Sequence, residues 1–190
     1  MEVTGRKTQW EGSFLRMVLL EYRDRQGRTR HWEVAERTNT DGVVIMAALT
    51  PDRRLVLIRQ FRPALESYII ELPAGLIDKG ESPDEACRRE LIEETGLAPE
   101  SIQTLTDGVI STGVLTENWH AMLATGAKPA TKEELKAFPP DETEDIEVIH
   151  VHLDRAFDEL SEMEKRGERI DIRIYGIIEL ARRKLDKAEA

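Results

Sequence analysis

One helix is marked more clearly than any other element of this 190-residue chain. Ser82 is a good N-cap, Pro83 suits the first helical position, and Glu85 completes a capping box with Ser82. Gly96 follows as a C-terminal stop. The sequence therefore predicts a helix from Pro83 to Thr95, and any fold for this chain must accommodate the side chains that this helix presents.

The predicted helix carries a row of carboxylates. Glu90, Glu93 and Glu94 stand at positions i, i+3 and i+4, so they share one face. In water such like charges repel each other by roughly a few tenths of a kcal/mol per pair. A hard cation such as Mg²⁺, which prefers oxygen ligands, relieves this repulsion. Glu81 can reach the same region, and Arg89 can orient Glu93. A solvated acidic face is the alternative for three glutamates alone.

The rest of the chain predicts strands followed by helices. A β hairpin is expected from segments 14–22 and 29–37, which join at a turn. Segment 128–145 is expected to be a long polar connection. Further strands are expected at 42–49, 54–61, 68–72, 102–109, 119–124 and 147–152, and two last helices at 155–165 and 171–187. This order indicates an α+β fold with a mixed sheet between helices. An N-terminal antiparallel β arm, residues 1–40, precedes a domain of residues 41–190.

Charge and cysteine content narrow the classes of function. The net charge of −10 disfavours binding to nucleic acid, because the phosphate backbone is itself negative. No apolar stretch approaches the roughly 18–20 residues that cross a bilayer, so no membrane partner is expected. The N-terminus lacks the features of a signal peptide. Cys87 is the single cysteine, which fits a reducing cytoplasm.

The helix and its flanks resemble the Nudix box, which is Gly, five residues, Glu, seven residues, then Arg-Glu-apolar-x-Glu-Glu-x-Gly-apolar. The matching positions are Gly75, Glu81, Arg89, Glu90, Leu91, Glu93, Glu94, Gly96 and Leu97. The resemblance implies the Nudix fold and a hydrolase that requires Mg²⁺, with Mn²⁺ as an alternative. It also implies that Glu90 and Glu94 are the principal metal ligands, that Glu93 shares in binding and that the Ala74 carbonyl contributes. Glu81 is then a peripheral ligand or a helper.

A second resemblance lies outside the box. Segments 32–37, 60–63 and 71–78 are similar to the ADP-ribose and ADP-sugar pyrophosphatase branch of the family. In that branch the N-terminal arm crosses to a partner subunit in a homodimer, and aromatic side chains sandwich the base. The matching aromatic residues are Phe14 and Trp32, for which ordinary strand packing is the alternative. The resemblance assigns Arg37 to base or ribose contacts and Arg62 to the diphosphate.

The resemblance also implies a catalytic base on a late loop. Glu144 is the first candidate and Glu142 the second, although a flexible acidic loop would look the same in sequence. Glu93 and Arg89 complete the expected catalytic set, and Glu117 is a candidate to support metal or substrate.

The expected activity is hydrolysis of the diphosphate bond of ADP-ribose or a related nucleoside diphosphate sugar. The branch often has Ser-Pro-Gly where this chain has Ser111-Thr112-Gly113, which leaves a broader hydrolase open, one that also accepts GDP-mannose. A non-catalytic Nudix module that senses ADP-ribose is a second alternative. It is expected to have lost its catalytic glutamates, and this chain has kept them.

Overall fold

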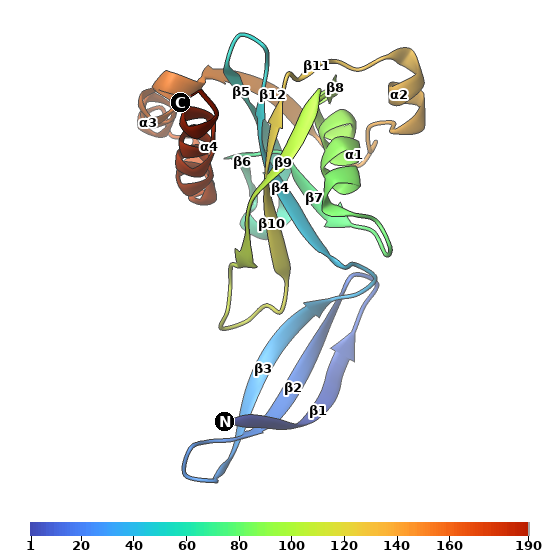
Figure 1. Cartoon of the computed structure of the whole chain (residues 1–190). Coiled ribbons are helices and arrows are strands. Elements are labelled where there is room, and N and C mark those ends of the chain that lie inside the picture. Colours follow the sequence, from blue (N-terminus) through green and yellow to red (C-terminus); the bar gives the residue numbers. More distant parts are fainter. Residues whose placement is uncertain (190) are drawn as a thin grey trace.

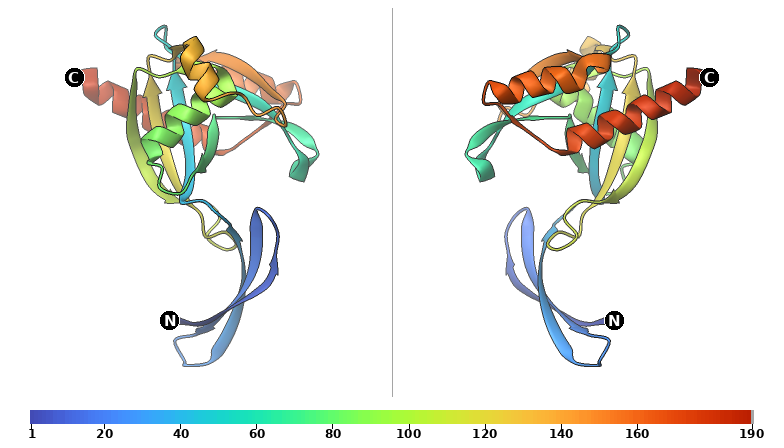
Figure 2. Two further views of the ribbon diagram at one scale, coloured as in Figure 1. Left: turned by 90° about the vertical axis from the view of Figure 1, so that its right-hand side faces the viewer. Right: turned by 90° about the vertical axis from the view of Figure 1, so that its left-hand side faces the viewer.

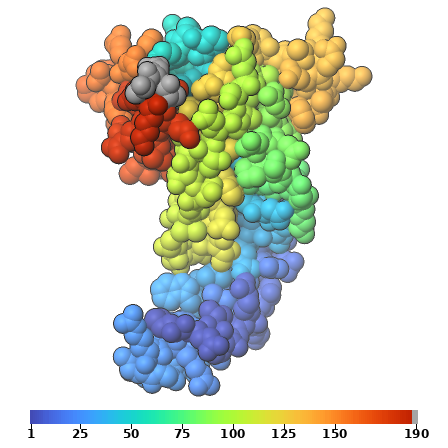
Figure 3. Space-filling model, viewed as in Figure 1, coloured from blue at the N-terminus to red at the C-terminus, as the bar shows by residue number. Residues whose placement is uncertain are grey.

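The chain forms a mixed α+β domain from which an N-terminal β arm projects (Figure 1). The computed structural model describes residues 1–189. The arm is a separate antiparallel sheet of three strands, β1 (Glu2–Glu11), β2 (Leu15–Arg23) and β3 (Thr29–Arg37). The space-filling view shows it as a lobe of its own below the domain (Figure 3).

The domain is built on one large mixed sheet. Its strands follow the order β13-β6-β5-β4-β10-β9, while β12 pairs with β5 and β7 pairs with β4. The pairs β4–β10 and β6–β13 are parallel, and the other pairs are antiparallel. The strands are β4 (Gly42–Leu49), β5 (Arg54–Arg62), β6 (Ser67–Glu71), β7 (Ala74–Ile77), β9 (Ser101–Val109), β10 (Asn118–Thr125), β12 (Ile146–His152) and β13 (Arg169–Ile170). The short strands β8 (Leu97–Ala98) and β11 (Lys128–Pro129) form a small sheet of their own.

Helices cover both faces of the large sheet (Figure 2). Helix α1 (Pro83–Thr95) packs on one face, and α3 (Ala156–Lys165) and α4 (Arg173–Glu189) pack on the other. Strand β4 explains why both faces must be covered. Its residues alternate between the two cores: Val44 and Met46 pack towards α1, whereas Ile45 and Ala47 pack towards α3 and α4. A strand buried on both sides has no face left for solvent, so it reads as a continuous apolar run.

The arm has a small core of its own. Val18 and Val34 are buried, and Glu36 is buried between the guanidinium groups of Arg6 and Arg16. A buried carboxylate is costly unless it is paired, and these two arginines provide the pairing. The arm nevertheless leaves many large apolar side chains exposed: Val3, Trp10, Phe14, Leu15, Met17 and Trp32.

Several elements differ from the sequence-based expectations. The arm has a third strand, β1, which pairs with β2 although nearly all of its side chains are exposed. Residues Ala74 and Gly75 begin strand β7, which is not among the expected strands. The expected connection 128–145 contains β11 and the short helix α2 (Lys132–Ala137), which a capping box between Thr131 and Glu134 starts. The predicted arm hairpin and helix α1 are confirmed. Among residues 1–189, no helix is long and apolar enough to span a membrane.

Candidate active site

Helix α1 begins and ends where the sequence predicts. The Ser82 hydroxyl accepts from the backbone N–H of Glu85, and the Glu85 carboxylate accepts from the backbone N–H of Ser82. Gly96 ends the helix with a φ of 68°, a left-handed conformation that favours glycine. Leu91 and Ile92 are fully buried, and Leu91 packs in the core between α1 and the sheet. This packing fixes the rotation of the helix and so directs its glutamate row towards β7.

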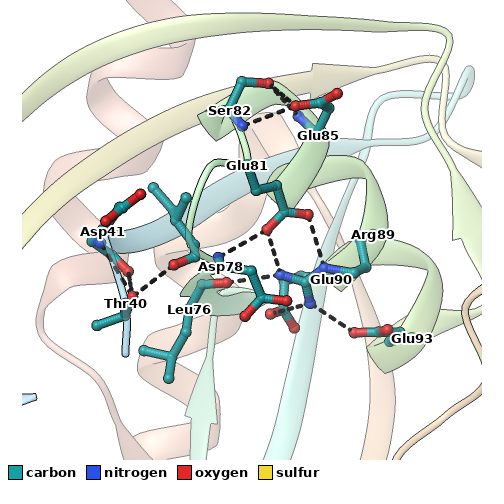
Figure 4. A network of polar contacts seen from close by, with 12 residues as sticks. Thr40, Asp41, Leu76, Asp78, Glu81, Ser82, Glu85, Arg89, Glu90 and Glu93 are labelled. Carbon is teal, nitrogen blue, oxygen red and sulfur yellow. Dashed lines mark hydrogen bonds and ion pairs between the residues drawn. The ribbon is translucent and has the colours of Figure 1, made fainter. Parts of the chain in front are cut away.

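Arg89 lies at the centre of the glutamates (Figure 4). Its guanidinium donates two bonds of 2.9 Å to Glu81, one of 2.7 Å to Glu90 and one of 3.0 Å to Glu93. A further bond of 2.8 Å goes to the carbonyl oxygen of Leu76 on β7. Bonds between charged partners are about twice as strong as neutral ones. One cation therefore holds three like-charged carboxylates close together.

Strand β7 leaves room for one of these carboxylates. A Cβ atom built on Gly75 would lie 1.8 Å from the carboxyl carbon of Glu90, closer than any real contact. Glycine at this position therefore lets the Glu90 carboxylate rest against the backbone of the strand. This is the close approach that the first glycine of the motif provides.

Burial changes the acidity of the helix glutamates. It raises the pKa of Glu90 to about 7, against the opposing charge of Arg89. Burial, followed by the charge of Glu90, raises the pKa of Glu94 well above its usual range, and Glu94 accepts a 3.0 Å bond from the backbone N–H of Ala74. Burial also raises the pKa of Glu93. For Glu81 burial acts in the same direction and is the largest single cause, but the bonds from Arg89 and from the backbone N–H of Asp78, with the charge of Arg89, together lower the pKa. Such shifts are typical of functional sites.

The glutamates open onto a polar cavity of about 410 Å³. Its acidic side includes Glu90, Glu93 and Glu144. A second group of lining residues is basic. We call it the arginine set, and it consists of Arg37 on β3, Arg62 on β5 and Arg173 on α4. A cavity with both signs of charge suits a ligand that brings an anion and a cation together.

The loop before β12 brings one of its two candidate bases to the cavity. Glu144 lines the cavity, and its negative charge contributes to the raised pKa values of Glu90 and Glu94. Glu142 is exposed and is not among the lining residues. Asp141 orders the loop by accepting from the backbone N–H of Thr143 at 2.8 Å.

The far end of this loop is attached to the sheet. The hydroxyl group of Tyr68 donates to the carboxylate of Asp145, which directly follows Glu144. The guanidinium of Arg59 lies 4.2 Å from the centre of the Tyr68 ring. These contacts restrain the segment that carries Glu144.

Glu117 holds two lining residues rather than facing the cavity itself. It accepts a 2.5 Å bond from Arg37 and a 3.1 Å bond from the indole N–H of Trp119. Both of its oxygens are therefore engaged by side chains that border the cavity. Arg62 is held in the same manner, through a 2.6 Å bond from its Nε to the buried Glu71.

The two aromatic residues of the arm that are candidates for base binding lie outside the cavity. Phe14 is 75% exposed and Trp32 is 50% exposed, so strand packing does not account for either side chain. Neither residue lines the cavity of its own chain. The Trp32 indole N–H donates a 2.8 Å bond to the carbonyl oxygen of Gly113. The segment that contains Thr112 is therefore a contact between the domain and the arm.

The structure adds two large residues to the site that the sequence did not reveal. Trp119 and Arg173 both line the cavity, and the guanidinium of Arg173 lies 4.4 Å from the centre of the Trp119 ring. Trp119 lies in strand β10 and Arg173 begins helix α4, and neither residue belongs to a sequence motif that indicates the site. Only the pairing of β4 with β10, and the packing of α4, bring them to the cavity.

The side chains fit a hard divalent cation by chemistry. Three glutamates of α1 supply oxygen donors of the kind that Mg²⁺ prefers, and the Gly75 cradle brings one of them against β7. Among the described residues, no three acidic, histidine or cysteine side chains are already gathered in a metal-binding geometry. The bonds from Arg89 to Glu81, Glu90 and Glu93 compete for the same oxygens.

Comparison with known proteins agrees with this geometry. The model of the NUDIX domain matches residues 38–171. An ADP-ribose pyrophosphatase of Saccharomyces cerevisiae is 34% identical over 173 residues, which cover 82% of this chain and 71% of the relative. A GDP-mannose pyrophosphatase of Escherichia coli is 36% identical over 142 residues, covering 72% and 69%. A crystal structure titled as an ADP compounds hydrolase superposes with a TM-score of 0.80 at 22% identity, covering 98% of this chain and 95% of that one.

These matches identify the class of protein. The chain belongs to the Nudix family, and it is a hydrolase that acts on pyrophosphate bonds. Nudix hydrolases generally use divalent metal cations, which agrees with the donor set on α1.

The raised pKa values predict that binding of Mg²⁺ to this protein depends on pH. Glu90, whose pKa is about 7, and Glu94, whose pKa burial raises well above its usual range, would have to lose protons to bind a cation. Affinity should therefore fall as the pH is lowered from 8 to 6, by up to about tenfold per pH unit for each proton displaced. Calorimetric titrations in buffers of different ionisation enthalpy measure the protons released.

The Glu90→Gln variant is the matched control, since it replaces one ionisable carboxyl group by an amide of nearly the same size. It should release fewer protons at pH 7 than the unaltered protein. Affinity that is independent of pH between 6 and 8 would show that these carboxyl groups are already ionised.

Proposed function

We propose that this protein uses Mg²⁺ to hydrolyse the diphosphate bond of ADP-ribose or a related nucleoside diphosphate sugar, releasing a nucleoside monophosphate and a sugar phosphate. The observation that carries the proposal is that Glu90 and Glu93 of α1, Glu144 and the arginine set line one cavity. A diphosphate that bridges a metal ion and guanidinium groups matches both signs of charge.

Glu90 and Glu94 are the proposed principal ligands of the metal. Glu93 shares in binding, the Ala74 carbonyl contributes, and Glu81 acts as a helper that is paired with Arg89. When bound, Mg²⁺, or Mn²⁺ as an alternative, supplies positive charge that offsets the charge developing on the phosphate oxygens. Arg89 is a positioning residue, because it holds Glu93 and Glu90 through their carboxylates.

Glu144 is the proposed general base. It lines the cavity, whereas Glu142 does not. Glu144 accepts a proton from the attacking water, the water oxygen bonds to phosphorus, and the bridging P–O bond breaks. The Tyr68–Asp145 hydrogen bond keeps this loop near the sheet, so the base needs little reorganisation.

The names of two relatives support a nucleoside diphosphate sugar as the substrate, but they give different sugars and bases. One acts on ADP-ribose by its name, and another on GDP-mannose. Thr112 lies between Ser111 and Gly113, and the Gly113 carbonyl contacts Trp32 of the arm. A change in this segment can therefore alter the contact between the arm and the domain. Because Thr112 stands where the branch often has proline, a broader nucleotide-sugar hydrolase is the second candidate.

The arm is the proposed dimerisation and base-binding unit, residues 1–40, beside a catalytic domain of residues 41–190. It exposes Trp10, Phe14 and Trp32, and large apolar side chains exposed together are typical of interaction surfaces. An exchanged arm in a homodimer would cover these side chains and bring Phe14 and Trp32 to the base of a substrate. The free and buried Cys87 fits the predicted cytoplasmic location.

The first experiment compares ADP-ribose, ADP-glucose, GDP-mannose and NADH side by side in Mg²⁺, with product analysis. We expect preferential release of AMP from ADP-ribose, and no release by the Glu94→Gln variant. Comparable turnover of several nucleotide sugars would establish the broader hydrolase. Binding without turnover of any of them would favour the sensing module and overturn the proposal.

Replacement of the base tests Glu144 directly. The Glu144→Gln variant should lower kcat by about 10²- to 10⁴-fold, because a general base contributes on that order. KM should change little, since glutamine keeps the size of the side chain. The matched control is Glu142→Gln on the same loop, which should retain the normal rate. A Glu144→Gln enzyme with unaltered kcat would eliminate this residue as the base.

Sedimentation of the full chain tests the exchanged arm. The monomer mass is 21.7 kDa, and we expect twice this mass at micromolar concentration. Replacement of Phe14 and Trp32 by serine should shift the protein towards the monomer. A mass near that of one chain for the unaltered protein would exclude the homodimer.

A further inference from the structure

The three residues of the arginine set are each held by a carboxylate in the same way. Each of its guanidinium groups donates from Nε to a carboxylate, with distances of 2.5 to 2.7 Å. The pairs are Arg37 with Glu117, Arg62 with Glu71, and Arg173 with Asp171. A guanidinium held by its Nε edge has terminal nitrogens left for a second ligand. Three side chains from different elements therefore border one cavity with donors to spare.

Arg173 is the most firmly fixed of the three. Asp171 accepts from its Nε at 2.7 Å, from Nη2 and from its backbone N–H at 2.9 Å. The ring of Trp119 lies 4.4 Å from its guanidinium carbon, within the range of a cation–π interaction. Trp119 is itself held by Glu117. Across the described residues, no hydrogen bond engages Nη1 of Arg173, so this group is available to a ligand in the cavity.

Arg173 is also linked to Arg62 through a buried carboxylate. Glu71 is only 6% exposed, and it bonds Arg62 at 2.6 Å through one oxygen. Its other oxygen lies 3.9 Å from Nη2 of Arg173. The buried glutamate thus sets the spacing of two guanidinium groups at the cavity. Two forks at a fixed spacing suit a ligand with several anionic oxygens, such as a diphosphate.

We propose that Arg173 is a substrate-binding residue, which donates from its free Nη1 edge to the phosphate oxygens of the bound nucleoside diphosphate. The residue follows the segment 38–171 that the family model matches, and it is the first residue of α4. It therefore supplements the glutamates of α1 from a helix on the opposite face of the sheet. The proposal rests on the diphosphate substrate class given under the proposed function.

The test uses the full chain with Arg173→Gln and Arg173→Lys. KM for the best nucleotide sugar, and Kd for ADP measured by calorimetry in Mg²⁺, should rise by about tenfold or more in Arg173→Gln, because a charge-assisted bond is lost. Arg173→Lys keeps the charge that balances Asp171 and Glu71 but lacks the fork, so it should recover part of the affinity. Melting temperatures establish that each variant is folded.

The matched control lies on the same helix. Arg182 also stacks on an aromatic ring, at 4.6 Å from the centre of Phe157, but it does not line the cavity. Arg182→Gln should leave KM and the Kd of ADP unchanged. The proposal is overturned if folded Arg173→Gln keeps both values, or if its kcat falls while both values stay the same. Binding of ADP is measured without turnover, so a wrong sugar assignment would not obscure the result.

Discussion

The interaction on which this structure depends is the neutralisation of clustered carboxylates by Arg89. Its guanidinium satisfies Glu81, Glu90 and Glu93 and also reaches the carbonyl of Leu76. Without a cation, like charges at helical spacing oppose the helix that displays them. With Arg89 in place, the same charges join α1 to β7 and to the loop before the helix. The residue that stabilises the site is thus also the one with which an added metal ion must compete.

Long-range packing determines which residues surround Arg89 and its glutamates. Strand β4 is buried on both faces, so it forms a rigid centre between α1 and the pair α3 and α4. The acidic groups come from the α1 side, and Arg173 comes from the start of α4. Their meeting at one cavity requires every layer of the sandwich to be in place. The chemistry is therefore a property of the whole domain, although the motif occupies a short segment.

Local signals in the sequence predicted local structure well. Helix α1 was predicted at its true bounds because its cap, first turn and C-terminal glycine all lie within a few residues. Strand β1 is not predictable from its sequence pattern, because nearly all of its side chains are exposed and show no alternation of burial. Only its pairing with β2 defines it as a strand. Helix α2 begins at a capping box of Thr131 and Glu134, a local signal within the segment that is expected to be a connection. Trp119 and Arg173 offered no signal, since only the tertiary fold gives them a common neighbour.

The contact between Gly75 and Glu90 has a consequence for the evolution of such chains. Every other amino acid carries a Cβ atom, and at Gly75 that atom would occupy the place of the Glu90 carboxylate. A descendant could therefore keep all of its acidic residues and still lose the room that one of them needs. Such a substitution of the glycine removes no charged residue, so a count of glutamates would not detect it. In chains with this motif, the glycine therefore indicates room for the carboxylate, which a count of glutamates alone does not.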